Sequence, residues 1–250
     1  YILAIFLFAL CSVNAAAQLT ENFSDGEFTS NPVWAGGTSD FIVNGSLQLQ
    51  SNNTVANSSY YLSTASTKAT TAQWEIFEEI DFNPSSANYV DVYLTSSDAD
   101  LSLATTTGYF VRIGGTSDEI CLYRKDNGSS TKIIDGADGV LNTSLSAIRI
   151  KVIRDASNQW QLFRDINASG MFSEGLVTDA NYLSSSYFGI FVKQSTASFF
   201  QKHFFDDIII GDYVPDTNPP FVITYTVTSP TTVDLLFNEP VDQVTSETLS

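Results

Sequence analysis

Two carboxylates with strand-like spacing are the groups best placed for catalysis in this sequence. Glu79 and Asp81 stand two residues apart in an alternating segment, so on a β-strand both side chains face the same side. Retaining hydrolysis of a glycosidic bond needs two carboxyl groups about 5 Å apart. The strand motif Glu-x-Asp-x-x-Glu supplies them, but Pro84 stands at its third position, so the general acid is missing. We therefore interpret this segment as a half-buried strand with a solvated acidic edge.

Other catalytic groups are scarce. His203 is the single histidine, which excludes Ser-His-Asp or Cys-His catalysis elsewhere in the chain and a zinc site built from several histidines. Cys121 is the single cysteine beyond residue 11, and its alternating surroundings indicate a half-buried strand residue rather than a reactive thiol. We assign no catalytic residue and expect a protein that is not an enzyme.

Binding of a sugar needs ring faces beside hydrogen-bonding side chains. The candidate ligand-binding rings are Trp34, Tyr60, Tyr61 and Trp160. Packing in the core is the alternative for Trp160, which shares a predicted strand face with Leu162, and for Trp34, which lies near a turn.

The charge balance argues against a nucleic-acid partner. Asp and Glu number 28 against 11 Lys and Arg, which gives a net charge of −17, whereas binding to phosphates needs a concentrated excess of basic residues. Most of the basic residues lie in the middle of the chain: Arg124, Lys125, Lys132, Arg149, Lys151, Arg154 and Arg164. We favour a solvated, edge-protecting face for them over a patch for anionic glycans.

The first residues indicate export. Residues 1–17 carry no charge, and an apolar stretch is followed by three alanines. This pattern predicts a signal peptide, cleaved after Ala17, and it is shorter than the roughly 20 apolar residues of a spanning helix. Because an initiator Met and a basic segment are absent, we expect the sequence to begin inside its gene. We expect a mature protein without a membrane span, located outside the cell or on its surface.

The remaining pattern is almost entirely that of β-strands. Apolar residues recur with a period of two, and clusters of Gly, Asn and Asp punctuate the runs. The predicted strands cover residues 39–43, 46–50, 59–63, 73–81, 89–95, 108–113, 119–124, 132–134, 147–154, 159–164, 187–193 and 203–210. About twelve such strands predict a two-sheet antiparallel sandwich of the jelly-roll type over residues 18–213.

A second domain is expected after a linker. Residues 214–220 contain three prolines, which stiffen the chain into an extended segment. Residues 221–250 hold only two predicted strands, 221–228 and 232–237, and two strands cannot enclose a core. We interpret them as the N-terminal part of another β-sandwich, with further domains of the same chain after Ser250.

Several motifs carry a resemblance to known families. The body, with Glu21-Asn-Phe-Ser-Asp-Gly26, Asp81-Phe-Asn-Pro-Ser-Ser86, Gly108-Tyr-Phe-Val-Arg-Ile-Gly-Gly115 and Phe204-Phe-Asp-Asp-Ile208, resembles a laminin-G-like, concanavalin A-like jelly roll. The linker with Phe237-Asn-Glu-Pro-Val241 resembles the start of a bacterial Ig-like domain. The combination is similar to large surface proteins, often with lamin-tail domains, of bacteria with type IX secretion.

The resemblance implies functions of three kinds. The first is a non-catalytic adhesion or ligand-presenting module whose partner is a polysaccharide or a surface protein. The alternatives are a carbohydrate-binding, lectin-like module and a degenerate glycosidase of the laminarinase type.

The resemblance also implies a structural Ca²⁺ where the first and last strands of the jelly roll meet. The expected ligands are Glu21 and Asp25 at one end of the domain and Asp206 and Asp207 at the other. Strict alternation along the last strand turns one of these two aspartates inward, where a carboxylate needs a cation or several hydrogen-bond donors. Backbone N–H donors for the inward aspartate are the alternative.

Overall fold

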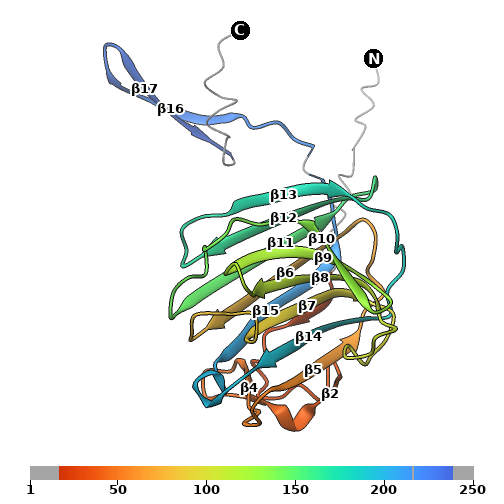
Figure 1. The fold of residues 1–250 in the computed structure, drawn as a ribbon. Helices are drawn as coiled ribbons and strands as arrows, with labels where there is room; N and C mark the ends of the chain where they lie inside the picture. Colours follow the sequence, from red (N-terminus) through yellow and green to blue (C-terminus); the bar gives the residue numbers. More distant parts are fainter. Residues whose placement is uncertain (1–16, 216, 239–250) are drawn as a thin grey trace. The chain divides into compact units, whose positions relative to one another are not determined.

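A computed structural model of the chain describes residues 17–215 and 217–238 (Figure 1). Residues 1–16, which carry most of the predicted signal peptide, lie outside the described residues. The chain divides into two compact units, and the division falls after Tyr213. The first unit is a β-sandwich. The second holds a hairpin of β16 (Val222–Ser229) and β17 (Thr232–Phe237).

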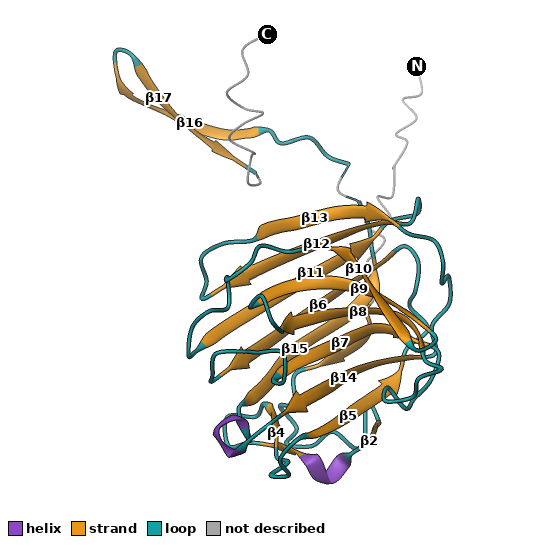
Figure 2. Cartoon of the chain, in the orientation of Figure 1, coloured by secondary structure: helices purple, strands orange, loops and turns teal. Residues whose placement is uncertain are grey.

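The first layer of the sandwich is an eight-stranded sheet (Figure 2). Its strand order is β13 (Phe172–Thr178), β12 (Gln159–Ile166), β11 (Ser146–Arg154), β6 (Ala72–Ile80), β15 (His203–Asp212), β4 (Leu49–Ser51) and β3 (Phe41–Val43). The eighth strand, β1 (Ala17–Glu21), also pairs with β15. The first and last strands of the domain therefore lie side by side, as a jelly roll requires.

The second layer is a seven-stranded sheet. Its order is β10 (Ser129–Ile134), β9 (Glu119–Asp126), β8 (Thr107–Gly114), β7 (Tyr89–Ser96), β14 (Tyr187–Gln194), β5 (Ser58–Ala65) and β2 (Trp34–Gly36). Every pairing in both sheets is antiparallel. The all-β, two-sheet prediction is thus confirmed.

The core lies between the two sheets and follows from the alternation. In β6, Trp74, Ile76, Glu78 and Ile80 point inward, while the residues that alternate with them are half-exposed. Trp74 stacks on Trp160 of β12 with ring centroids 5.7 Å apart. Burying such side chains removes a large apolar area from water, which is the main force that holds the two sheets together.

Three strands of the sandwich were not predicted, namely β1, β2 and β13. β2 is only three residues long, and β13 is an edge strand in which Phe172 and Leu176 are 51% and 65% exposed, so it has no buried face to set an alternation. Two 3₁₀ turns, Thr38–Asp40 and Ala197–Phe199, are the helical segments of the described residues, and neither has the length or apolar character needed to cross a membrane.

Candidate ligand-binding site

The outer face of the seven-stranded sheet carries an unusual set of aromatic and charged side chains. Alternation sends Val90 and Val92 of β7 into the core and turns Tyr89, Asp91 and Tyr93 outward. The register of the ladders then sets outward residues opposite one another. Asp91 faces Arg112 of β8, and Phe110 faces Tyr93 on one side and Tyr123 on the other.

Arg112 is held rigidly at the middle of this face. Its Nε and Nη2 donate to the two carboxylate oxygens of Asp91 at 2.7 and 2.8 Å. Its guanidinium carbon lies 4.0 Å from the ring centre of Tyr89 and 5.2 Å from that of Tyr123. A bidentate pair between flanking rings fixes the position of the guanidinium group.

One half of the aromatic face is covered by the loop 97–106. Leu101 of this loop packs on Tyr93 and Phe110, which leaves these two rings 4% and 1% exposed. The fit depends on Gly189 beneath the loop, because a Cβ there would lie 2.7 Å from Leu101 Cδ1. The hydroxyl of Ser63 also donates to the carbonyl oxygen of Ala99 at 2.7 Å. The rings under the loop are therefore closed to solvent.

The other half of the face is open and forms a pocket of about 430 Å³, which we call the Arg112 pocket. It is lined by Ser86, Tyr89, Arg112, Gly114, Gly115, Thr116, Ser117, Glu119, Tyr123 and Lys132. Gly114 has φ of +93°, and a Cβ there would lie 2.6 Å from Cβ of Pro84, so the turn below the pocket requires glycine. Burial raises the pKa of Tyr89 and of Tyr123, so both hydroxyls stay neutral.

A small polar cluster forms one wall of this pocket. Lys132 Nζ lies 2.7 Å from Glu119 Oε1 and also binds Asp135. Among the described residues, the ligand atoms of Glu119, Cys121 and Asp135 lie within 4.8 Å of one another, which is a spacing suited to a metal ion. The donor set does not fit, because the Lys132 ammonium already binds both carboxylates and burial raises the pKa of the Cys121 thiol to about 12.

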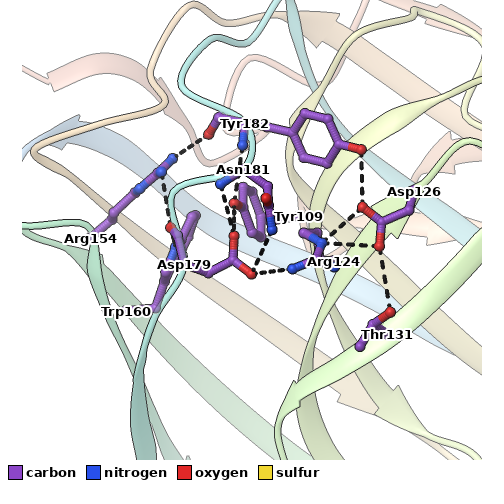
Figure 3. Close-up of polar contacts among 9 residues, drawn as sticks. All are labelled: Tyr109, Arg124, Asp126, Thr131, Arg154, Trp160, Asp179, Asn181 and Tyr182. Carbon is purple, nitrogen blue, oxygen red and sulfur yellow. Dashed lines mark hydrogen bonds and ion pairs between the residues drawn. The ribbon is translucent and has the colours of Figure 1, made fainter.

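A second polar cluster ties the two sheets together (Figure 3). Asp179 accepts a hydrogen bond from Tyr109 at 2.5 Å and one from Arg124, both of the seven-stranded sheet. Its backbone carbonyl accepts from Trp160 Nε1 at 3.1 Å and from Arg154 at 3.2 Å, both of the eight-stranded sheet. Arg154, Tyr109 and Trp160 are fully buried and the side chain of Arg124 is 22% exposed, so most of this cluster is closed to a ligand.

Three of the four predicted ligand-binding rings lie in the core. Trp34, Tyr60 and Trp160 are 2%, 4% and 0% exposed, so none of them can stack on a ligand from solvent. The alternation of β5 determines which of the two tyrosines is buried. It turns Tyr60 inward and Tyr61 outward onto the aromatic face. Sequence reasoning missed Tyr89, Arg112 and Tyr123. The signal that could have found them is the outward position of each residue on three consecutive strands. These residues form a site only because the register of the hairpins places them side by side.

The predicted calcium ligands do not converge. A β-bulge in β15 between Asp206 and Ile209, with Asp207 at φ of +47°, lets Phe205 and Ile208 both point inward. The expectation that one aspartate faces the core is therefore wrong, since both are half-exposed. Asp207 pairs with Arg149 at 2.9 Å.

The other two predicted ligands have separate surroundings. Glu21 accepts from the backbone N–H of Phe23 at 2.7 Å, and Asp25 is exposed. Among the described residues, these four carboxylates do not form a group with metal-ligand spacing.

Two polar residues that do face the core are Glu78 and His203, which were not singled out as partners. They are 0% and 1% exposed, and His203 Nδ1 lies 2.8 Å from Glu78 Oε1. Phe82 and Phe205 pack on the imidazole ring, with centroids 5.1 and 6.1 Å away. Glu78 Oε2 and His203 Nε2 have no hydrogen-bond partner.

The seven basic residues in the middle of the sequence are spread over several faces. Arg149 and Lys151 lie on the outer face of the eight-stranded sheet and pair with Asp207 and Glu75. Arg154 is fully buried. Of the seven basic residues, Lys132 alone lines the Arg112 pocket.

Comparisons with known proteins identify the class of the sandwich. No protein-family model and no curated protein sequence matches the chain. Solved structures do match, and they are lectin-like jelly-roll domains, so the concanavalin A-like prediction for the fold is confirmed.

Three of these structures illustrate the likeness. The VIP36 exoplasmic/lumenal domain in its Ca²⁺-bound form aligns with a TM-score of 0.57 at 10% identity, over 79% of this chain and 90% of that chain. The Emp46p carbohydrate recognition domain in its potassium-bound form gives 0.55 at 10% identity, over 79% and 97%. Peanut lectin with a 9mer peptide gives 0.52 at 13% identity, over 76% and 94%. At such identities the likeness concerns the fold alone.

Proposed function

We propose that the sandwich domain is a non-catalytic carbohydrate-binding module and that the Arg112 pocket holds the sugar. The observation that carries this proposal is the composition of the pocket. Two tyrosine rings flank a fixed guanidinium group, and hydroxyl, ammonium and carboxylate groups complete the lining. Rings that stack on the apolar faces of a sugar, beside a few polar groups that bind its hydroxyls, are the usual make-up of such sites.

The fold supports this proposal. The solved structures that share the sandwich include one named a carbohydrate recognition domain and one named a lectin. Carbohydrate binding thus replaces adhesion as the first interpretation. Adhesion and ligand presentation remain the wider role that we propose for the protein as a whole, and we also propose that it is exported.

The hairpin of the second unit supports the multidomain part of the proposal. Ile223, Tyr225, Val227 and Leu236 are 56–68% exposed in it, and two strands offer no second layer to cover them. We propose that the hairpin belongs to an Ig-like sandwich that buries these side chains.

A glycan array tests the function. The chain should bind a defined set of glycans in a saturable manner, and Tyr123→Ala should weaken that binding at least tenfold by removing one stacking face. Tyr225→Ala is the matched control, because it removes an exposed tyrosine of the hairpin and should leave binding unchanged. An array without specific binding would contradict the proposal.

A further inference from the structure

We infer that the Arg112 pocket selects neutral sugars and rejects acidic and amino sugars, an inference that rests on the proposed function. It follows from the hydrogen-bonding capacity that the pocket side chains leave unused. Arg112 and Glu119 are diagonal neighbours on the outer face of the sheet, since Arg112 faces Cys121 and Glu119 faces Gly114 in the ladder between β8 and β9.

Unused donors come from Arg112 and Lys132. A guanidinium group has five N–H bonds, and Asp91 takes one from Nε and one from Nη2. An ammonium group has three N–H bonds. Lys132 donates one to Glu119 and one to Asp135, so the third N–H bond is unused. Neither side chain has another hydrogen-bonding partner among the described residues.

An unused acceptor comes from Glu119. This residue is 6% exposed, and its Oε2 has no hydrogen-bond partner although its Oε1 binds Lys132. A buried carboxylate oxygen without a donor is unfavourable, so a ligand that supplies one is favoured. Glu119 Oε2 is itself buried, so in this inference a ligand group reaches it only when the side chain of Lys132, which is 29% exposed, rotates away from Glu119.

Only a group that both donates and accepts satisfies this arrangement. A hydroxyl can donate to Glu119 Oε2 and accept from an unused N–H of Arg112 at once. A carboxylate only accepts, so in this pocket it would lie against the Glu119 carboxylate. An ammonium only donates, so it would lie against Arg112 and Lys132. Two neighbouring hydroxyls of a neutral sugar therefore fit the pocket better than either charged group.

The surrounding charges act in the same direction for acidic polymers. The Arg112 charge is balanced by Asp91, whereas Lys132 faces two carboxylates, those of Glu119 and Asp135. The chain as a whole carries a net charge of −17, and this overall charge repels a polyanion.

The test compares three classes of glycan by calorimetry with the full chain at physiological salt. The neutral class is mannan, laminarin and arabinoxylan oligosaccharides, the acidic class is alginate and polygalacturonate oligosaccharides, and the amino-sugar class is chitosan oligosaccharides. We expect binding within the neutral class only. Binding to an acidic or amino-sugar probe that equals or exceeds neutral binding would overturn this inference and leave carbohydrate binding intact. Failure of all three classes would overturn both.

Variants assign the selection to the pocket. Glu119→Gln keeps the size of the side chain but presents a donor where the acceptor stood, so neutral binding should fall at least tenfold. Glu79→Gln on the opposite sheet is the matched control and should bind like the parent chain. If Glu119→Gln fails to fold, Lys132→Gln on edge strand β10 decides, again with an expected loss of at least tenfold. Neutral binding that survives in the folded variants would overturn the inference.

Discussion

The buried pair of Glu78 and His203 gives the sharpest prediction for stability. Glu78→Leu removes one partner and leaves the imidazole among Phe82 and Phe205 without a hydrogen bond. Breaking a buried charged or polar pair in this way costs about 3–5 kcal/mol. The free carboxylate oxygen and the free imidazole nitrogen of the parent chain already bear part of such a penalty, so we expect the lower end, about 3 kcal/mol.

Replacing both partners should reverse the loss. In the double variant Glu78→Leu with His203→Phe, no polar atom of the pair remains unpaired, and well-packed apolar residues at such sites are neutral or stabilising by about 1–4 kcal/mol. Urea unfolding followed by tryptophan fluorescence measures both variants, since Trp34, Trp74 and Trp160 are all buried in the folded state. A double variant no more stable than Glu78→Leu would refute the reasoning.

The same pair predicts a dependence on pH. Burial raises the pKa of Glu78 above its ordinary value of 4.5, so the folded state holds this proton more tightly than the unfolded state. The contribution to stability is then fully present below pH 4.5 and is lost as the pH rises through the raised pKa of the folded state. The free energy of unfolding of the parent chain, minus that of the double variant, should therefore decrease with rising pH. A difference that stays constant or increases would contradict this sign.

Three further predictions concern other parts of the sandwich. Gly189→Ala should cost about 1–3 kcal/mol in urea unfolding, because the new Cβ meets Leu101 and the carbonyl of Leu62; an unchanged midpoint would show that loop 97–106 is not tightly seated. Cys121 should react with a thiol reagent only on unfolding, since it is 1% exposed and its pKa is raised to about 12; rapid labelling of the folded chain would count against its placement. Asp207→Asn should change stability by less than about 1 kcal/mol, because it removes only a half-exposed ion pair with Arg149. The melting temperatures of the parent chain and of this variant should both be independent of Ca²⁺ and EDTA. A calcium effect that is present in the parent chain and lost in the variant would reinstate Asp207 as a ligand.

Alternation made most of the fold predictable from the sequence. Strands such as β6, β7 and β11 bury one face and expose the other, so a period of two reveals them and their inward residues. β13 shows the limit, because both of its faces lie in partial contact with solvent and the apolar pattern carries no signal.

The site could not be predicted in the same way. The bulge at Asp206 and Asp207 shifts the alternation by one residue, and no pattern in the neighbouring residues predicts this shift. The Arg112 pocket depends on pairings between strands, and each strand alone shows only an outward tyrosine or arginine. The Gly-Gly-Thr-Ser-Asp segment at 114–118 lies beside the pocket, but its residue types alone do not show that Tyr89, Arg112 and Tyr123 line a pocket there.

The loop between β7 and β8 determines how much of the aromatic face is open to solvent, and it does so without contributing to the sheets of the sandwich. It contributes no strand and covers Tyr93 and Phe110 through one leucine, while the ladders of the sheet continue beneath it. A shorter loop at this position would turn the closed half of the face into an extension of the pocket without altering a single backbone pairing. The extent of the open aromatic face is therefore set by one connection, which can change independently of the fold.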